Sequence, residues 1–133
     1  MAGDDSGKLL LRLLIGALLL FHGIAKIVYG IDDIGGLLVA NGLPGSIASA
    51  VYIGEIVAPL CLIFGVWVRV AGLVIAANMI FAIVLAHPDH VFQLGPTGGW
   101  KLELQAFYLL GGLVVAMLGA GKYAAQRRRS ALN

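Results

Sequence analysis

The feature that most constrains the fold is an apolar stretch that runs almost without interruption over residues 47–86. As a single helix it would be ~60 Å long, because each residue of an α-helix adds ~1.5 Å, and that is about twice the thickness of the hydrocarbon core of a bilayer. The stretch must therefore fold in two. Gly65, Trp67 and Arg69 mark the turn, because they combine a helix-ending glycine, an interfacial aromatic ring and a cation that can reach water.

The chain as a whole has the composition of an integral membrane protein. Hydrophobic residues make up 60% of its 133 residues and charged residues only 12%, whereas a soluble domain is closer to an even split. Four crossings would use about eighty residues, so the length fits one domain, residues 1–133. We predict an all-α, four-helix membrane bundle whose spans are residues 9–29, 47–64, 70–86 and 102–121.

The first predicted span carries Arg12, His22 and Lys26 within an apolar run. On a helix with ~100° per residue, these side chains share about a third of the circumference with Gly16 and Gly23. Leucine, isoleucine and phenylalanine cover the rest, which suits lipid, so the mixed stripe is expected to face other helices or a wet cavity. The run is long and lacks a clear small-x-small cleavage site, so we interpret it as a retained span and not as a signal peptide.

The segments outside the spans are short and polar. Residues 1–8 are polar and are expected to be mobile until Asp4, Asp5 or Ser6 caps the first helix. Residues 34–40 are too few and too rich in glycine to span, so we predict a short interfacial or re-entrant segment between the first two spans. Prolines and glycines in residues 87–99 exclude a continuous helix there, and residues 122–133 form a basic tail.

The positions of the basic residues predict the orientation. Positive residues gather on the cytoplasmic side of membrane proteins, so we predict a multi-pass protein of the bacterial inner membrane with both termini in the cytoplasm. The arginine run at 127–129 is interpreted as an anchor on anionic lipid and not as a nucleic-acid site. This orientation places seven cations inside, Lys8, Arg12, Arg69, Lys122, Arg127, Arg128 and Arg129, and two outside, Lys26 and Lys101.

Polar residues of different spans are expected at matching depths near the outer surface. Counted inward at ~1.5 Å per residue, His22, Glu55 and Asn78 each lie roughly 12 Å below that surface, and Lys26 and Glu103 roughly 5 Å below it. An ionisable group at such depth costs about 2.5–3.5 kcal/mol on insertion scales, so it should find a partner or water. Glu55 is therefore expected to meet His22, Lys26 or water.

Pro59 strengthens the interpretation of Glu55 as a polar centre. It stands four residues after Glu55 and lacks the amide that would bond the Glu55 carbonyl in a regular helix. The set His22, Lys26, Glu55 and Glu103 is interpreted as a functional pocket that opens outward. The alternative is that such groups only hold helices together, and for Asn78 and Gln105 taken alone we favour that alternative.

Three further groups are weighed against their structural alternatives. Arg12, near the cytoplasmic end, is either an anchor that reaches the surface or a contributor to ligand binding. Cys61, the single cysteine, is expected to be a small buried residue, and it excludes an internal disulfide. No metal site is expected at His87 and His90, and no haem, because His22 and His87 lie at different depths.

Four stretches of the sequence resemble the DoxX family of small four-span bacterial membrane proteins. The resemblance covers nearly the whole chain, and its most specific parts are the pattern Arg12, His22, Gly23 and Lys26 and the glutamate Glu55. The end differs, because Gly121 leads into a basic tail. The stretches are RLLIGALLLFHGIAKI, GLP at residues 42–44, GEIVAPLCLIFGVWVR and GGWKLELQAFYLLGGL.

The resemblance implies a redox setting, since the family includes a subunit of a thiosulfate:quinone oxidoreductase and a member associated with superoxide dismutase and a sulfurtransferase. We therefore expect a membrane subunit that binds quinone, or a similar lipophilic redox molecule, and that takes electrons from a soluble or membrane partner protein. Glu55 and His22 would exchange protons, and Lys26 and Glu103 would pair at the mouth of the pocket and orient the substrate. Asn78 and Arg12 would also bind the substrate. The alternatives are a carrier or channel for a small solute, and a structural or assembly subunit; the oligomeric state, a homo-oligomer included, stays open.

Overall fold

A computed structural model of the chain describes residues 2–126 and 132. These residues form α1 (Ala2–Tyr29), α2 (Asp32–Ala40), the 3₁₀ turn η1 (Gly45–Ala50), the π-helical turn η2 (Ile53–Val57), α3 (Ala58–Phe64), α4 (Val68–Ala86), the 3₁₀ turn η3 (Pro88–His90) and α5 (Glu103–Leu118). Within the described residues there is no strand, and an isolated bridge joins Leu94 and Trp100. The expectation of an all-α protein is confirmed.

Three helical segments are long and apolar enough to cross a membrane. They are Gly3–Tyr29, Gly45–Phe64, which comprises η1, η2 and α3, and Val68–Ala86. The fourth apolar helix, α5, has 16 residues and is shorter than a typical span. α1, α3, α4 and α5 pack side by side, and their contacts enclose a core of residues that include Ile15, Leu19, Leu62, Ile75 and Val115.

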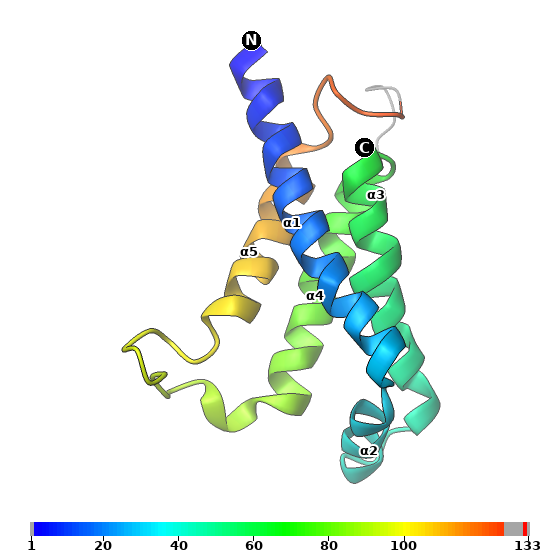
Figure 1. Ribbon diagram of the computed structural model, residues 1–133, viewed down its shortest axis with the longest axis vertical. Helices are drawn as coiled ribbons and strands as arrows, with labels where there is room; N and C mark the ends of the chain where they lie inside the picture. The colour runs from blue at the N-terminus through cyan, green and yellow to red at the C-terminus, as the bar shows by residue number, and fades with distance from the viewer. Residues whose placement is uncertain (1, 127–131, 133) are drawn as a thin grey trace.

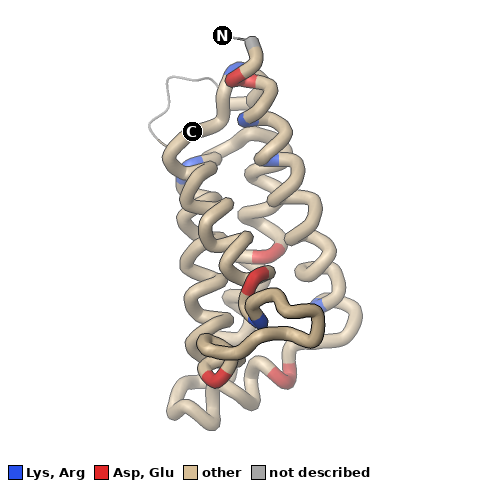
Figure 2. The backbone as a smooth tube through the Cα atoms, turned by 90° about the vertical axis from the view of Figure 1, so that its left-hand side faces the viewer, with Lys and Arg blue, Asp and Glu red and all other residues tan. Residues whose placement is uncertain are grey.

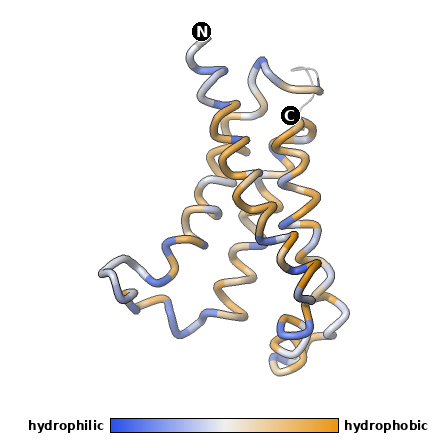
Figure 3. Tube along the Cα trace, viewed as in Figure 1, coloured by the Kyte–Doolittle hydropathy of each residue, from blue (hydrophilic) through white to orange (hydrophobic). Residues whose placement is uncertain are grey.

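The two ends of the molecule differ. Figure 1 shows α1 beginning, and the described tail ending, at one end, which we call the terminal end; α2 and the loop between α4 and α5 lie at the other, the loop end. Figure 2 shows several basic residues toward the terminal end. Lys8 and Arg12 lie in the first half of α1, the Lys122 amide bonds Asp5, and Arg69 donates to carbonyls near the end of α5. In Figure 3, hydrophobic residues dominate the helices, and hydrophilic ones recur in the loop between α4 and α5.

The turn between α3 and α4 lies where the sequence predicts it. Gly65 adopts φ 72° and closes α3, with its amide donating to the Cys61 carbonyl at 2.9 Å. Trp67 also has a positive φ, 47°, and α4 begins at the next residue. The described part of the tail packs on this turn, because the Ala125 amide donates to the Phe64 carbonyl at 3.0 Å.

Two predicted boundaries are wrong. Residues 2–8 are helical, not a mobile lead, and they are fixed because the Asp5 carboxylate accepts a hydrogen bond from the Lys122 amide at 3.0 Å. Acidic residues in a first turn also favour a helix by their interaction with its dipole. The last helix ends at Leu118, three residues early, because Gly119 adopts φ 72°, outside the helical region. The arginines at 127–129 lie outside the described residues.

Segment α2 is a separate short helix that crosses the loop end. It follows Gly30, which adopts φ 89°, and it contacts η1 and α4. Leu38 is its buried residue. The predicted short segment between the first two long helices therefore exists as α2. It packs back on the bundle and covers one side of a cavity at the loop end.

Candidate functional site

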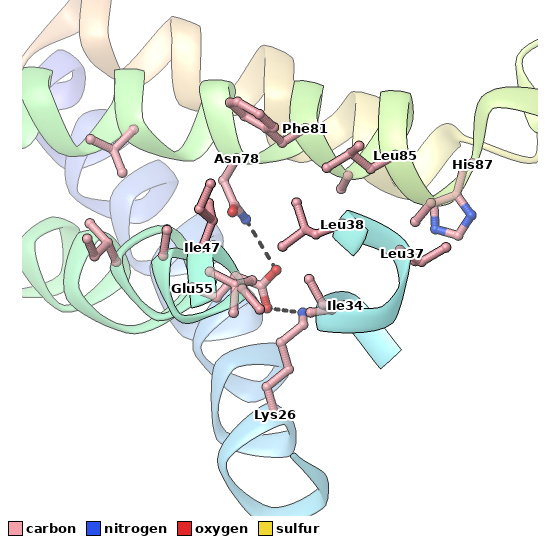
Figure 4. A pocket seen from close by; sticks show the side chains of 18 residues that line it. Lys26, Ile34, Leu37, Leu38, Ile47, Glu55, Asn78, Phe81, Leu85 and His87 are labelled. Carbon is pink, nitrogen blue, oxygen red and sulfur yellow. Dashed lines mark hydrogen bonds and ion pairs between the residues drawn. The ribbon is translucent and has the colours of Figure 1, made fainter. Parts of the chain in front are cut away.

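The site is centred on Glu55, a glutamate that is only 4% exposed. Its Oε2 forms an ion pair with Lys26 Nζ of α1, and its Oε1 accepts a hydrogen bond from Asn78 Nδ2 of α4 at 3.2 Å. Figure 4 shows the two partners reaching the carboxylate from different helices. Three segments that are distant in sequence thus meet at one carboxylate, which satisfies the charge that burial would otherwise penalise.

The backbone around Glu55 is specialised for this placement. Pro59 lacks an amide hydrogen, and the helix widens into the π-helical turn η2, which is a feature often found at functional sites. The neighbouring helices approach closely because two positions are glycine. A Cβ at Gly23 would lie 2.2 Å from the Glu55 carbonyl oxygen, and one at Gly54 would lie 2.5 Å from Asn78 Cγ.

Lys26 is held at both ends. Its ammonium pairs with Glu55, and its backbone carbonyl accepts a hydrogen bond from the Tyr52 hydroxyl at 3.2 Å. The Lys26 side chain is 26% exposed and the Glu55 side chain 6% exposed, so the pair sits at a boundary between protein interior and open space. A pair in this position can rearrange when a ligand approaches, since it is anchored in the protein but not enclosed by it.

A larger cavity of about 460 Å³ borders one side of the ion pair. It lies between α2, η1, η2 and α4, and 14 of its 18 lining residues are apolar. Ile34, Leu38, Ile47, Phe81 and Leu85 are among them. The other four lining residues are Lys26, Glu55, Asn78 and His87, so the cavity combines a mostly apolar wall with a few polar groups, as small-molecule sites do.

A smaller cavity of about 200 Å³ borders the pair from α1, α4 and α5. It shares Lys26, Glu55, Ala82 and His87 with the larger cavity. Its own walls include further polar side chains, His22, Gln105 and Tyr108. Two buried acceptors at this cavity, Gln105 Oε1 and His87 Nδ1, lack a hydrogen-bond partner among the described residues.

His22 lines the smaller cavity with Glu55, as its predicted role in proton exchange requires. Its Nδ1 lies 3.2 Å from the Leu18 carbonyl oxygen, and its ring meets the Tyr108 ring edge-on, with the centroids 5.8 Å apart. Because Nδ1 donates to that carbonyl, Nε2 is the ring nitrogen that stays available for a second hydrogen bond.

The predicted pair of Lys26 with Glu103 does not form, because Lys26 pairs with Glu55. Glu103 is exposed at the start of α5, and its carboxylate turns toward the loop, where a Cβ on Gly99 would lie 2.6 Å from Glu103 Oε2. Figure 1 shows α1 and α5 diverging toward the loop end. The depth count placed the two residues at one height, but it carried no information on this divergence.

Arg12 lies in the other half of the molecule, near the terminal end. It is 1% exposed, and its Nε donates to the Leu62 carbonyl at 2.9 Å while its Nη1 donates to the Tyr123 carbonyl at 2.9 Å and to the Ala120 carbonyl. Of the described residues, neither Arg12 nor Glu103 belongs to the lining of either cavity. The structure thus separates them from the other four predicted site residues.

The structure adds three residues that the sequence reasoning did not place in the pocket, Tyr108, Gln105 and His87. Gln105 and Tyr108 are three positions apart on α5 and therefore lie on one face of the helix, a spacing that could have indicated a shared polar surface. His87 follows α4 directly. Burial lowers the pKa of His87, and the nearby His90 and Lys101 lower it further, so neutral His87 keeps a nitrogen that can accept a hydrogen bond.

No group of three or more histidine, cysteine, aspartate or glutamate side chains within the described ranges is arranged to hold a metal ion. His87 and His90 stack, with ring centroids 5.1 Å apart and an interplanar angle of 18°. The polar side chains of the described residues converge instead around Glu55.

In a comparison with protein families, residues 7–88 match the model described as DoxX. The matched segment contains Lys26, Glu55 and Asn78, and it ends before Gln105 and Tyr108. Neither the curated proteins nor the solved structures contain a match to the chain.

Proposed function

We propose, from the premise that this chain belongs to the DoxX family of membrane proteins, that it is a membrane subunit of a redox system and binds quinone or a similar lipophilic redox molecule in the larger cavity. The electron donor resides on a soluble or membrane partner protein. Links to sulfur redox chemistry or to oxidative-stress defence are part of this proposal, and so is the bacterial inner membrane as its location.

The proposed membrane arrangement has four spans in one domain, residues 1–133, with α2 at the interface. α5 is ~24 Å long by its 16 residues, which a membrane accommodates by local thinning. In this arrangement the terminal end faces the cytoplasm, because Lys8 and Arg12 lie early in α1, Lys122 contacts Asp5 there, and Arg69 contacts the end of α5. Exposed apolar side chains such as Leu10 and Phe21, each 68% exposed, then contact lipid.

The observation that carries the proposal is the placement of the Lys26–Glu55–Asn78 cluster at one wall of an otherwise apolar cavity. A volume of about 460 Å³ is within the range of small-molecule sites. The apolar walls suit a ring that partitions into membranes, and such rings are large contributors to binding when they are desolvated.

The polar residues have distinct proposed roles at the ligand. Quinone, when bound, supplies the redox chemistry by exchanging two electrons and two protons. Glu55 gives or takes a proton at a carbonyl oxygen of the quinone, and Lys26 and Asn78 donate hydrogen bonds that orient the ring. His22, across the ion pair on the smaller cavity, takes part in the same proton exchange.

The test compares Glu55→Gln with Glu103→Gln. Both changes remove one carboxylate with little change of shape, but only Glu55 borders the cavities, while Glu103 is exposed. Each variant is purified in mild detergent, and a ubiquinone or menaquinone is titrated by intrinsic fluorescence. We expect Glu55→Gln to weaken binding about 10- to 100-fold, since a hydrogen bond to a charged group is worth ~1.5–3 kcal/mol, and Glu103→Gln to leave binding unchanged.

Equal binding by the wild type and both variants, or no binding by any of them, would overturn the proposal. Flux of a small polar solute through proteoliposomes that contain only this chain, in place of quinone binding, would favour a carrier. A partner captured equally well by both variants, without quinone, would favour a structural or assembly subunit.

A further inference from the structure

The two cavities that meet at Glu55 differ in character. In the larger cavity, 4 of 18 lining residues carry a polar side chain, whereas in the smaller one the count is 6 of 10. The six are His22, Lys26, Glu55, His87, Gln105 and Tyr108. A wall of that composition suits water better than an apolar ligand.

Two polar atoms of side chains that line the smaller cavity have no hydrogen-bond partner among the residues that the structure describes. They are Gln105 Oε1 and His87 Nδ1, and both are buried. A buried polar group left without a partner costs about 1–3 kcal/mol, so such groups are generally satisfied by ordered water where protein atoms do not reach them. Because both side chains line the cavity, a small side-chain rotation would let water in the cavity bond each of these atoms.

The cavity is large enough for several water molecules. Its volume is about 200 Å³, and one water needs roughly 10–15 Å³ of this measure. Its lining extends from Glu55 to His87, which lies at the end of α4, where the loop at the loop end begins. Water in this cavity would therefore connect the buried ion pair with the loop.

We propose that the smaller cavity is a water-filled half-channel that carries protons between Glu55 and the aqueous phase at the loop end. The inference rests on the proposed function in one respect, because the half-channel would supply the proton that Glu55 exchanges with the ligand. A proton from bulk water passes along waters that are hydrogen-bonded to His87 and Gln105 and binds the Glu55 carboxylate. When Glu55 releases that proton to the ligand, the carboxylate returns to its starting state, with Lys26 as its counter-ion throughout.

This assignment gives the two cavities different roles. The ligand approaches Glu55 from the apolar side, and the proton approaches it from the polar side. His22 and Tyr108 line the route beside Glu55, and their ring contact fixes the position of the imidazole. Glu55 is then the group through which both routes pass.

Cysteine accessibility tests the inference without quinone. In a Cys61→Ala background, Gln105→Cys is compared with Phe107→Cys, which lies two positions further on α5, is 49% exposed before replacement and lines neither cavity. Proteoliposomes are treated with a small cationic methanethiosulfonate. The cysteine thiolate, which forms only in water, attacks the sulfur of the reagent, forms a disulfide and displaces methanesulfinate. We therefore expect Gln105→Cys to react about tenfold faster or more than Phe107→Cys.

The side from which the reagent enters is part of the test. Gln93→Cys marks the loop end, because Gln93 is exposed in the loop. We expect Gln105→Cys to react from the same side as Gln93→Cys. If Gln105→Cys does not fold, Ala82→Cys replaces it, since Ala82 borders both cavities and cysteine is only slightly larger.

Reaction of the cavity cysteine no faster than Phe107→Cys, or from the opposite side to Gln93→Cys, would overturn the half-channel. Failure of the quinone titration would leave these rates unchanged, because the labelling needs only water. A dry smaller cavity in a protein that binds quinone would refute the half-channel alone, so the two failures are distinguishable.

Discussion

Two buried charges, Arg12 near the terminal end and Glu55 toward the loop end, are accommodated in different ways. The Arg12 guanidinium donates to backbone carbonyls at the end of α3 and after α5, including those of Leu62 and Tyr123. The Glu55 carboxylate meets side chains, those of Lys26 and Asn78, and borders two cavities. The contacts of Arg12 join the end of α3 to the residues after α5, and we call this set of hydrogen bonds the clasp. Glu55, in contrast, has the environment of a group that can change partners.

The comparison shows why depth in the membrane does not by itself indicate function. Both residues are polar and buried, with 1% and 4% exposure. Arg12 satisfies carbonyls that would otherwise be left at helix ends, where the helix dipole also favours a cation. In contrast, two side chains that line a cavity with Glu55, those of His87 and Gln105, each have a buried polar atom without a partner among the described residues. Incomplete satisfaction next to open space is the feature that separates a candidate site from a structural contact.

The largest effect is expected from breaking the clasp. Arg12→Met keeps the aliphatic stem but removes every donor, so we expect it to lower the free energy of unfolding by about 3–5 kcal/mol, since two or more hydrogen bonds from a charged group are lost and their carbonyls are left unpaired. Unfolding in mixed micelles measures the loss. Arg69→Met is the control, because Arg69 also donates to carbonyls near the end of α5, those of Ala116 and Met117, but is only half-buried.

If Arg12 is a structural contact only, Arg12→Met should leave quinone binding unchanged. The fraction of the variant that remains folded should bind quinone with the affinity of the wild type, because Arg12 lines neither cavity. If a folded Arg12→Met protein has lost quinone binding, Arg12 contributes to ligand binding, and the difference proposed here between Arg12 and Glu55 is wrong.

An intermediate effect is expected from separating the ion pair. Lys26→Met leaves the Glu55 carboxylate buried without its cation, and we expect a loss of about 2–3 kcal/mol in the free energy of unfolding, less than for a fully enclosed pair because Lys26 is partly exposed. The double variant Lys26→Met, Glu55→Gln should regain most of this stability without regaining ligand binding. Recovery of both properties together would show that the pair acts only in packing.

The smallest effect in this series is expected from the helix contact that positions Glu55. Gly23→Ala places a methyl group 2.2 Å from the Glu55 carbonyl oxygen unless the helices separate, so we expect a loss of about 1–3 kcal/mol in stability together with weaker quinone binding. Gly36→Ala in α2 is the matched control, because nothing lies within 4 Å of its Cβ position. Equal stability and binding in the two variants would mean that this close approach does not set the geometry of the site.

The sequence predicts the helices better than it predicts their partners. Hydrophobic length and Gly65 are local signals, and they place the turn between α3 and α4 correctly. The ordered start of α1 was missed, because it depends on the contact of Asp5 with Lys122, more than a hundred residues away. Such long-range contacts leave no trace in local composition.

For the site, counting residues along each span predicted the depth of each polar residue in the membrane, but not the direction in which its side chain points. It placed Glu55, His22 and Asn78 at one level, and all three line at least one of the two cavities. It gave Lys26 as one possible partner of Glu55, which the ion pair confirms, but it also paired Lys26 with Glu103, and α1 and α5 diverge toward the loop end. Crossing angles and helix irregularities arise from packing over the whole bundle, so the sequence pattern of one span cannot predict them.

The most direct measurement of the central claim, that a lipophilic redox molecule occupies the larger cavity beside Glu55, is photolabelling with an azidoquinone followed by peptide mapping. The account predicts label on lining residues such as Ile34, Leu38 and Phe81, and its loss when unlabelled quinone is added. Label that falls instead on the outward-facing Leu10 and Phe21, and that excess quinone does not displace, would contradict it.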